Sequence, residues 1–306
     1  MVDVVVTGGA GFIGGFVVRR LLDWRWRVTV VDDFSTGDMF NLPPPSPLLN
    51  VVEHDISIGD RLEALFDGAD AVVHLAAVSS VPACEADVEK AFAVNVTGTE
   101  NVLNACVAKN VEKVVFVSSA AVYGEAEGVI TEETPVNPVS VYGRTKLLAE
   151  TLVQSFSEKK KIEAVVLRVF NAYGKTKAKN GFGVVDQFID DVVHGRALNV
   201  HGDGGQVRDF VYVGDVADAV VSCLERNFDG MEVFNIGSGA GFSVLEVAEL
   251  VLKAFGKTSS SIVHAPPRPN DVRYSVASVE KARRMLGYSP SVNLKKYVEE
   301  RAKQLV

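Results

Sequence analysis

Tyr142 and Lys146 are the residues of this chain whose types and spacing most directly suggest chemistry. Residues four apart on a helix share one face, so the ammonium group can stabilise the ionised phenol. At about 4 Å and an effective dielectric constant of about 20, this attraction is roughly 4 kcal/mol, which lowers a tyrosine pKa from about 10 to near neutrality. Such a tyrosine can act as a general base on a hydroxyl group while a nicotinamide accepts hydride from the same carbon.

A second pair with the same spacing, Tyr173 and Lys177, shows that the spacing alone is not decisive. Tyr142 precedes a stretch with the pattern of an amphipathic helix, expected over 141–159. Tyr173 instead follows an expected strand and leads into a segment rich in glycine and lysine, where we expect a loop. Context is therefore needed to separate the two pairs.

The segment Thr7-Gly8-Gly9-Ala10-Gly11-Phe12-Ile13-Gly14 is the second feature with chemical meaning. Glycines at its first, fourth and seventh positions after Thr7 allow a tight turn and bring backbone N–H groups close to a pyrophosphate at a helix N-terminus. The spacing differs from G-x-G-x-x-G, and a purely structural turn is the alternative. Its place directly after the first expected strand favours dinucleotide binding.

Two carboxylates, Asp32 and Asp33, stand at the end of the second expected strand. A carboxylate there accepts hydrogen bonds from the adenosine ribose and repels a 2′-phosphate. Because no arginine lies close by in the sequence, the pattern predicts NAD in preference to NADP.

Composition narrows the class of protein. A chain of 306 residues with a net charge of −8 and no basic stripe is unlike a nucleic-acid-binding surface. The three cysteines are widely separated, which predicts buried thiols without disulfides, and the five histidines show no metal-ligand spacing. No apolar run reaches membrane-spanning length, and the first strand begins at once, so a cytoplasmic protein is expected.

Strands and helices alternate through the first half, which predicts an α/β protein with a Rossmann-type, doubly wound parallel sheet. The expected strands are 2–7, 27–32, 50–54, 71–75, 113–118 and 163–170, and the expected helices are 11–23, 87–110 and 141–159. Further on, we expect helices at 184–194 and 216–227 and strands at 210–213 and 232–236, followed by a helix opened by a capping box at Ser243 and Glu246. A proline-rich loop covers 265–271, and two terminal helices start near 278 and 293.

This organisation predicts two domains. Residues 1–171 would form the dinucleotide-binding domain, with a returning segment near 208–237. Residues 172–306 would form a smaller α/β substrate domain over the carboxyl ends of the strands, where such sheets bind ligands.

Ten segments in fixed order carry a resemblance to a known family. They are the glycine loop, 32–37, His54-Asp55-Ile56, His74-Leu75-Ala76-Ala77, 95–99, 118–124, Tyr142 to Lys146, 168–171, 202–210 and 268–271. In this order the chain resembles the extended short-chain dehydrogenase/reductase family, and within it the UDP-glucose (UDP-galactose) 4-epimerases. The resemblance also selects Tyr142 over Tyr173.

The resemblance implies a role for each matching residue. Ser119 would hydrogen-bond the reacting sugar hydroxyl, Tyr142 would exchange its proton, and Lys146 would hold the nicotinamide ribose and lower the tyrosine pKa. The implied NAD-binding residues are Gly8, Gly11, Phe12, Ile13, Gly14, Asp32, Asp33, Ser35, Gly37, Asp55, Ile56, Leu75, Ala76, Ala77, Asn95, Tyr142, Lys146 and Phe170. The implied substrate-binding residues are Ser119, Tyr142, Asn171, Val200, Arg208, Arg268 and Asp271.

Ala120 and Ala121 are informative because related nucleotide-sugar dehydratases carry an Asp-Glu pair there, and related decarboxylases keep a glutamate at the second position. A methyl group moves no proton, so the resemblance favours interconversion of UDP-galactose and UDP-glucose with tightly held NAD. A 4-epimerase of UDP-N-acetylglucosamine, UDP-glucuronate or a dTDP-sugar is the alternative, and a dehydratase or decarboxylase is a further one. Ser79 replaces a lysine common near the cofactor phosphates, and the small Ser275 hints that N-acetylated sugars fit.

The partners implied are a UDP-sugar and a second copy of the chain, without nucleic acid, membrane or metal. Family members commonly form homodimers through two helices per subunit, for which 87–110 and 141–159 are the candidates. A non-catalytic NAD-sensing protein is a third reading, but it would have no need of Ser119, Tyr142 and Lys146 together.

Overall fold

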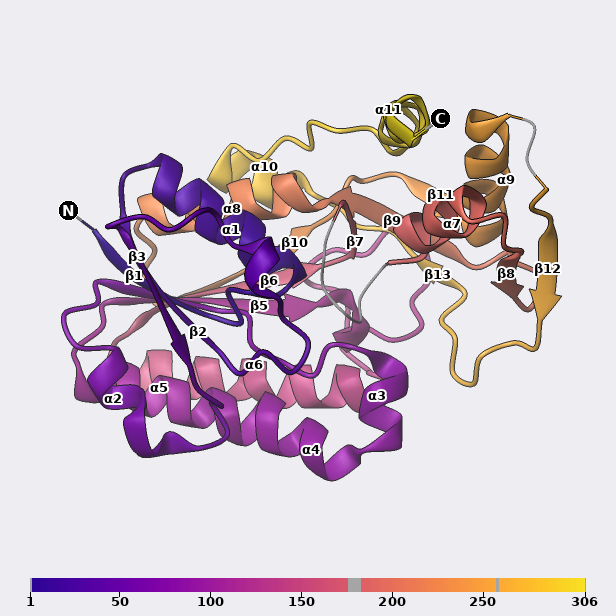
Figure 1. Ribbon diagram of the computed structural model, residues 1–306. Helices are drawn as coiled ribbons and strands as arrows, with labels where there is room; N and C mark the ends of the chain where they lie inside the picture. Colours follow the sequence, from indigo (N-terminus) through magenta and orange to yellow (C-terminus); the bar gives the residue numbers. More distant parts are fainter. Residues whose placement is uncertain (1, 176–182, 257–258, 306) are drawn as a thin grey trace.

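The computed structural model describes residues 2–175, 183–256 and 259–305. Its largest element is a seven-stranded parallel sheet in the order β10-β6-β5-β4-β1-β2-β3 (Figure 1). These strands are β1 Asp3–Thr7, β2 Arg27–Asp32, β3 Leu49–Glu53, β4 Ala71–His74, β5 Lys113–Ser119, β6 Glu163–Val169 and β10 Met231–Ile236. The doubly wound parallel sheet expected from the sequence is confirmed.

Helices cover both faces of this sheet, which explains why its central strands are almost wholly apolar. One face carries α1 Phe12–Asp23, α8 Val213–Glu225 and α10 Glu280–Leu286. The other carries α2 Leu62–Leu65, α3 Val81–Ala86, α4 Val88–Phe92, α5 Gly98–Ala108 and α6 Val141–Lys160. Short 3₁₀ turns occur at Met39–Asn41, Gly59–Arg61 and Ala120–Val122.

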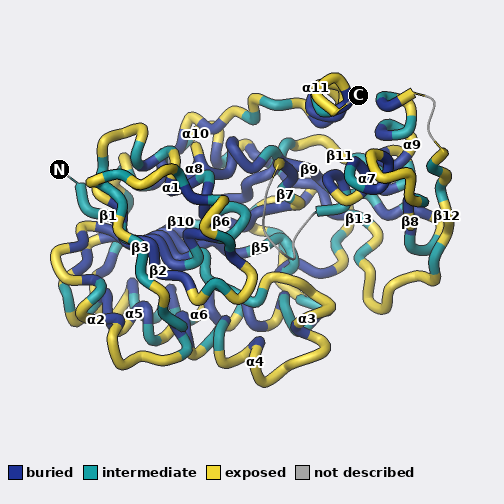
Figure 2. Tube along the Cα trace, viewed as in Figure 1, coloured by how far each residue is buried: buried dark blue, intermediate teal, exposed yellow. Residues whose placement is uncertain are grey.

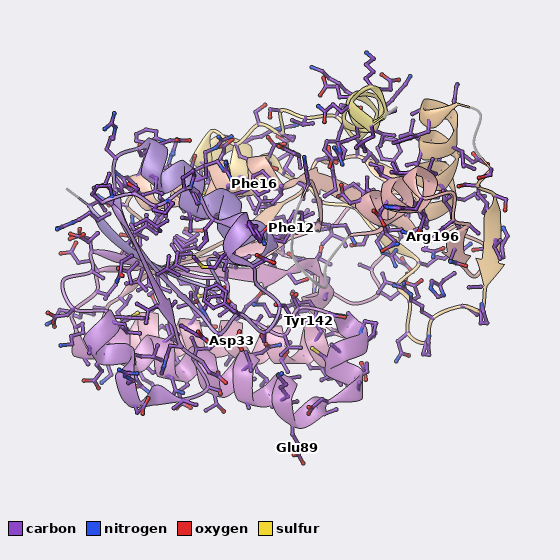
Figure 3. All side chains as sticks on the ribbon, in the orientation of Figure 1. Phe12, Phe16, Asp33, Glu89, Tyr142 and Arg196 are labelled. Atoms are coloured by element: carbon purple, nitrogen blue, oxygen red, sulfur yellow. The ribbon has the colours of Figure 1, made fainter. Side chains whose placement is uncertain are left out.

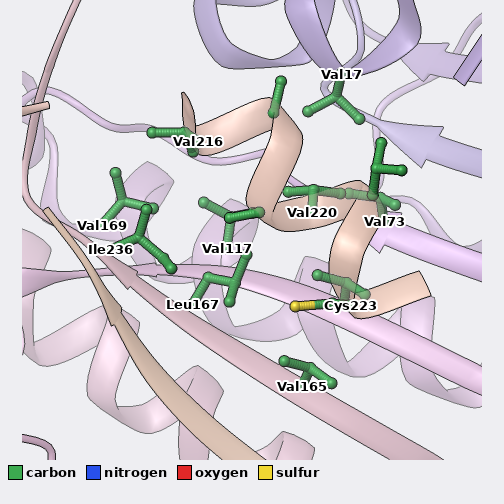
Figure 4. Packing of buried hydrophobic residues seen from close by; sticks show 14 of the residues in the cluster. Val17, Val73, Val117, Val165, Leu167, Val169, Val216, Val220, Cys223 and Ile236 are labelled. Carbon is green, nitrogen blue, oxygen red and sulfur yellow. The ribbon is translucent and has the colours of Figure 1, made fainter. Parts of the chain in front are cut away.

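A buried apolar cluster fills the space between the sheet and each helix layer (Figure 2). On the side of α1 and α8, branched side chains from the strands interlock with Val17, Val216 and Val220 of the helices (Figure 4). Full burial of a valine or leucine side chain contributes about 1.5–3 kcal/mol, so these layers fix the positions of the strand ends.

The strand order reverses at β1, whose neighbours are β2 on one side and β4 on the other. The connections that follow these strands lead to opposite faces of the sheet, and they leave a crevice at the carboxyl ends of β1 and β4. The glycine loop lies at this crevice because it joins β1 to α1.

A second, smaller lobe is built around β7 Asn171–Tyr173, β9 Val207–Tyr212, β11 Gly241–Ser243 and β13 Tyr274–Ser275. A separate pair joins β8 Leu198–His201 to β12 Ile262–Ala265. The helices α7 Val184–Val193, α9 Val244–Phe255 and α11 Leu294–Leu305 share a third apolar cluster with these strands. The capping box that opens α9 is confirmed: Glu246 N–H donates to Ser243 Oγ, and Ser243 N–H donates to the Glu246 carboxylate.

The division into domains at residue 171 stays a prediction. The chain returns from the second lobe to supply α8 and then β10, which pairs with β6 in the first sheet. It returns once more with α10, which packs against β10 and α8.

The structure differs from four expectations for individual elements. The helix expected over 87–110 contains a π-helical turn at Ala93–Thr97 between α4 and α5, where buried Asn95 bonds outside the helix. The strand expected at 210–213 begins at Val207, and α8 starts at Val213, not residue 216. Tyr173 lies in β7, not in a loop, and its fully buried ring packs on Tyr297. Lys177 lies outside the described residues.

Candidate active site

A cavity of about 810 Å³ occupies the crevice at the carboxyl ends of the parallel strands. Figure 3 marks Phe12, Asp33 and Tyr142 around this region. Most of the predicted cofactor residues and all three predicted catalytic residues line it: Gly8, Gly11, Phe12, Ile13, Gly14, Asp32, Asp33, Ser35, Asp55, Ile56, Leu75, Ala76, Ala77, Ser119, Tyr142, Lys146 and Phe170. Residues far apart in the sequence therefore share one cavity of ligand size.

The glycine loop has the shape of a cradle that side chains would fill. Gly8 has φ +70°, and a Cβ added there would stand 2.6 Å from the backbone nitrogen of Ala76. A Cβ on Gly14 would stand 2.2 Å from the carbonyl oxygen of Gly8. Gly11 is the N-cap of α1, so the positive end of that helix faces the cavity. This arrangement suits the pyrophosphate of a dinucleotide.

Asp32 is held in one orientation at the same cavity. Its carboxylate accepts hydrogen bonds from Ala10 N–H and Phe34 N–H, both at 2.9 Å, and burial raises its pKa. Gly37 does not line the cavity; a Cβ there would stand 2.8 Å from Asp32 Oδ1. The absence of a side chain at Gly37 makes room for Asp32, and its role in cofactor binding stays a prediction.

Asn95 also lies behind the cavity wall and does not line it. Its Oδ1 accepts from Val78 N–H at 2.7 Å, while Nδ2 donates to Val78 C=O and to Thr145 Oγ1. The amide of Asn95 thus joins the loop after β4 to α6, and its expected place in the cofactor site stays a prediction.

The sequence reasoning assigned no role to His74 itself, although the residue belongs to a family segment. Its ring lies between Thr7 Oγ1 and Thr99 Oγ1, at 2.7 and 2.9 Å. Burial, followed by the nearby charge of Lys146, lowers its pKa to about 3, so the ring is neutral at physiological pH. It braces β1 against α5 below the cofactor cavity.

Tyr142 and Lys146 are presented by the first turns of α6. Ser140 caps the helix by accepting from Gly143 N–H at 3.0 Å, and Glu85 accepts from Val141 N–H at 2.9 Å. These contacts fix the helix start, so the tyrosine and lysine stand one turn apart at the cavity wall. Ser119, the last residue of β5, is the hydrogen-bonding partner of Tyr142.

The electrostatics of this group differ from the sequence-based expectation. Burial raises the pKa of Tyr142 to about 12, and the hydrogen bond from Ser119 only partly opposes this. Burial also lowers the pKa of Lys146 to about 7, against the raising effect of Glu150. The expectation that Lys146 brings the tyrosine pKa near neutrality was wrong for the protein alone, because desolvation dominates both groups.

A second cavity, of about 680 Å³, lies in the smaller lobe and is rich in polar side chains. It is lined by the predicted substrate residues Asn171, Arg208, Arg268 and Asp271. The two cavities share the chain segment 170–172: Phe170 and Ala172 line the cofactor cavity, and Asn171, between them, lines the second cavity.

Arg208 is the most constrained cation of this second cavity. Its Nη2 donates to Asp271 Oδ1 at 2.6 Å, and its side chain is 13% exposed. Burial lowers its pKa even though Asp271 opposes this, and the charge of Arg268 lowers it further. The sheltered guanidinium of Arg208 and the exposed one of Arg268 line the same cavity, and two guanidinium groups are suited to a diphosphate.

The predicted substrate contact of Val200 stays a prediction, because its side chain does not line the cavity. Its side chain is fully buried in the apolar cluster of the second lobe, and its neighbours Asn199 and His201 line the cavity in its place. Successive residues of a strand point to opposite sides, so the choice between them depends on which face of β8 is inward.

Several residues of this cavity were missed from the sequence. Arg196 lines it while its Nε donates to Asp191 at 2.8 Å (Figure 3 marks Arg196). His201 and Gln206 line it too, and Gln206 Nε2 donates to the carbonyl oxygen of His201 at 3.1 Å. In the sequence, His201 and Gln206 could have been found by their position on either side of the Gly202-Asp203-Gly204 turn.

Within 2–175, 183–256 and 259–305, no helix is long and apolar enough to cross a membrane. The same residues contain no cluster of three or more His, Cys, Asp or Glu side chains arranged to hold a metal ion.

Comparisons with known proteins agree with this geometry. A model of the NAD dependent epimerase/dehydratase family matches residues 4–237. The chain is 33% identical over 306 residues to a putative UDP-glucose 4-epimerase of Methanocaldococcus jannaschii, covering 97% of this chain and 96% of that protein. Its structure resembles that of the UDP-glucose 4-epimerase of Thermotoga maritima solved with UDP-glucose, with a TM-score of 0.92, 32% identity and coverage of 98% and 97%.

A dTDP-glucose 4,6-dehydratase of Streptomyces venezuelae, solved with NAD, matches equally well in shape, with a TM-score of 0.92, 29% identity and coverage of 98% and 96%. Backbone shape therefore does not separate the two reactions. Because the family model spans most of the chain and its relatives match it nearly end to end, the chain belongs to the NAD dependent epimerase/dehydratase family, a branch of the extended short-chain dehydrogenases/reductases whose members are NAD-dependent enzymes.

Proposed function

We propose that this protein is a UDP-sugar 4-epimerase that interconverts UDP-galactose and UDP-glucose through a transient 4-keto sugar. The observation that carries the proposal is that two cavities of complementary chemistry share the chain segment 170–172. Ser119, Tyr142 and Lys146 line the cavity that suits a dinucleotide, and Arg208 and Arg268 line the other.

The residues of the larger cavity fit NAD. Its glycine cradle leaves no room for a Cβ, and the oriented carboxylate of Asp32 can accept hydrogen bonds from the adenosine ribose. Asp55 and Ile56 would flank the adenine, and Phe170 would contact the nicotinamide side. NAD bound there supplies the acceptor, and then the donor, of the C4 hydride.

The protein's own part of the chemistry is to move one proton and to hold the sugar. Tyr142 would accept the proton of the C4 hydroxyl and return it after the ketone has turned. Ser119 would donate a hydrogen bond to the same oxygen and keep it against the phenol. Lys146, buried beside them, would stabilise the phenolate while it exists.

The residues beside Ser119 support epimerisation over elimination. Ala120 and Ala121 form the 3₁₀ turn that follows β5, and neither can act as an acid or a base. A dehydratase needs an acid to expel the C6 hydroxyl, which a methyl group cannot supply. This favours epimerisation even though the dehydratase backbone matches equally well.

The nucleotide diphosphate would lie in the second cavity, with Arg208 and Arg268 on its phosphates. Asp271, which holds Arg208, would keep that guanidinium in place until the anion arrives. Ser275 is small and buried in β13, opposite Arg208 in β9, so a 4-epimerase of an N-acetylated or carboxylated UDP-sugar is the second candidate.

Turnover on UDP-glucose, UDP-N-acetylglucosamine and UDP-glucuronate, with product analysis by chromatography and mass spectrometry, tests the proposal. We expect UDP-galactose from UDP-glucose at unchanged mass, and NAD in the purified protein. Tyr142→Phe is expected to retain NAD and to lose about 10²–10⁴-fold in kcat. Full activity in that variant would remove Tyr142 as the base, and loss of mass would indicate a lyase.

We also propose that the enzyme acts as a cytoplasmic homodimer. Exposed apolar side chains on neighbouring helices support this, namely Val81 of α3, Val88 and Phe92 of α4 and Leu148 of α6. The three cysteines are free and buried, as in a reducing compartment.

A further inference from the structure

Directly behind the predicted catalytic residues lies a buried polar cluster that the reaction described above does not use. Its centre is Glu150, one helical turn beyond Lys146 on α6 and 5% exposed. Ser118 Oγ donates to Glu150 Oε1 at 2.5 Å, and Arg168 Nη2 donates to Oε2 at 2.7 Å. The two carboxylate oxygens thus connect α6 to β5 and to β6.

The cluster continues away from the cavity. Arg168 Nη1 donates to the Tyr123 hydroxyl at 3.0 Å, and that hydroxyl donates to Asn235 Oδ1 of β10 at 2.7 Å. Burial disfavours the charge of Arg168, but its hydrogen bonds to Glu150 outweigh this and raise its pKa. The ion pair is therefore maintained in a place where a single charge would be costly.

The three elements that Glu150 joins are the ones that carry the active site. Ser118 precedes Ser119 in β5. Arg168 lies near the end of β6, two residues before Phe170, which follows the strand. Lys146 is on the same face of α6 as Glu150. A displacement of Glu150 would therefore move Ser119 and Lys146 relative to each other.

We propose that Glu150 is a positioning residue for the reaction, whose buried carboxylate keeps Ser119 and the charged Lys146 in register with Tyr142. The proposal deepens the proposed function and rests on it. Glu150 touches neither cavity and acts through its neighbours.

Among the titratable groups around Lys146, Glu150 is the one that opposes the effect of burial on the lysine pKa. The ammonium nitrogen lies 4.2 Å from the centre of the Phe116 ring of β5, and the other neighbours that titrate are His74 of β4, Cys84 of α3 and Tyr142. His74 is neutral, and burial raises the pKa of Cys84 to about 11, so its thiol is neutral too. The Glu150 carboxylate is thus the group that raises the pKa of Lys146 against the effect of burial.

The first test measures the titration of Lys146 itself and needs no substrate. NMR of the protein labelled in its lysine side chains, with the signal assigned by its loss in Lys146→Met, gives the midpoint directly. Removing a neighbouring charge in Glu150→Gln is expected to lower this midpoint by about one unit or more, whereas Glu150→Asp keeps it close to that of the parent. An unchanged midpoint in a folded Glu150→Gln variant would overturn the proposal.

The matched control is Glu163→Gln. Glu163 pairs with Lys113 at 2.9 Å between the same two strands, at their opposite ends, and is also largely buried. The Glu163→Gln variant should lower the midpoint of thermal unfolding as Glu150→Gln does, but it should leave the titration midpoint of Lys146 unchanged. If Glu150→Gln fails to fold, the double variant Glu150→Gln/Arg168→Met removes both charges of the pair. The titration midpoint of Lys146 is then measured in that variant.

Kinetics then connect the cluster to turnover. Glu150→Gln should lower kcat at least about tenfold, with little change in KM, and should move the acid limb of the kcat profile to lower pH. A rise in KM at constant kcat would contradict a positioning role. If none of the UDP-sugars were turned over, the proposed function would fail while the lysine titration would still decide the role of Glu150.

Discussion

Replacement of Lys146 by methionine tests how the active site makes a tyrosine act as a base. Methionine keeps the length of the side chain, so the change removes the charge from a position that is only 2% exposed. With the pKa of Tyr142 at about 12, about one molecule in 10⁴ carries a phenolate at pH 8. Removal of a positive charge about 4 Å away should lower that population further by roughly 4 kcal/mol, or about 10³-fold.

The same argument fixes the pH dependence in the parent enzyme. Lys146 has a pKa of about 7, and we expect it to titrate as a coupled pair with Tyr142, one helical turn away. Once the pair has lost one proton, the neutral lysine beside the phenol and the ammonium beside the phenolate are two forms of one state. Activity should therefore rise with pH through an apparent pKa near 7 and then level off. In Lys146→Met this limb disappears, and the rate should rise about tenfold per pH unit from pH 7 to pH 10.

A coupled assay that converts UDP-galactose to UDP-glucose, at saturating substrate and with added NAD, measures kcat from pH 5.5 to pH 10. We expect a loss of about 10³-fold at pH 8. Bound NAD, released by denaturation and measured by absorbance, separates this loss from cofactor release. Lys109→Met, at a surface ion pair with Asp67, is the control. A variant that keeps more than a third of kcat, or keeps the limb near pH 7, would refute the reasoning.

Three further outcomes are expected. Gly14→Ala should abolish NAD retention, measured on the purified protein, because its Cβ would stand 2.2 Å from Gly8 O; normal NAD content would contradict this. The pKa of His74 is lowered from 6.5 to about 3, so the contribution of the neutral ring to the free energy of unfolding is complete above pH 6.5. As the pH falls from 6.5 towards 3, this contribution should be lost at about 1.4 kcal/mol per pH unit, which urea unfolding measures. His74→Asn should weaken this slope, and the exposed control His264→Asn should not. Leu148→Glu should yield monomers in light scattering; an intact dimer would exclude α6 from the interface.

Local patterns in the sequence were sufficient for the parallel sheet. Continuous valine-rich runs predicted the strands, and the glycines between β1 and α1 predicted the cradle, because both follow from the immediate neighbours along the chain. The π-helical turn at Ala93–Thr97 was not predictable in this way. It coincides with the hydrogen bonds that Asn95 makes to Val78 and Thr145, which lie far from it in the sequence.

The candidate site shows the same division between features that the sequence predicted and features that required the fold. The identity and spacing of Tyr142, Lys146 and the glycines identified the cofactor cavity from the sequence, since each chemistry needs those residue types. The fold was needed to show that Asn199 and His201 line the second cavity while the side chain of Val200 faces the apolar cluster, because packing sets which face of β8 is inward. Arg196, too, reaches the cavity only once β8 is placed beside α7.

The sequence by itself determined the family and the cofactor, and it predicted the residues that would move a proton. Tertiary structure decided the charge of those residues. Spacing on a helix indicates that Tyr142 and Lys146 attract each other, but burial opposes the charge of both, and the depth of burial depends on strands and helices from the whole first lobe. The opposing carboxylate of Glu150 acquires its importance only when β5 and β6 place Ser118 and Arg168 against it.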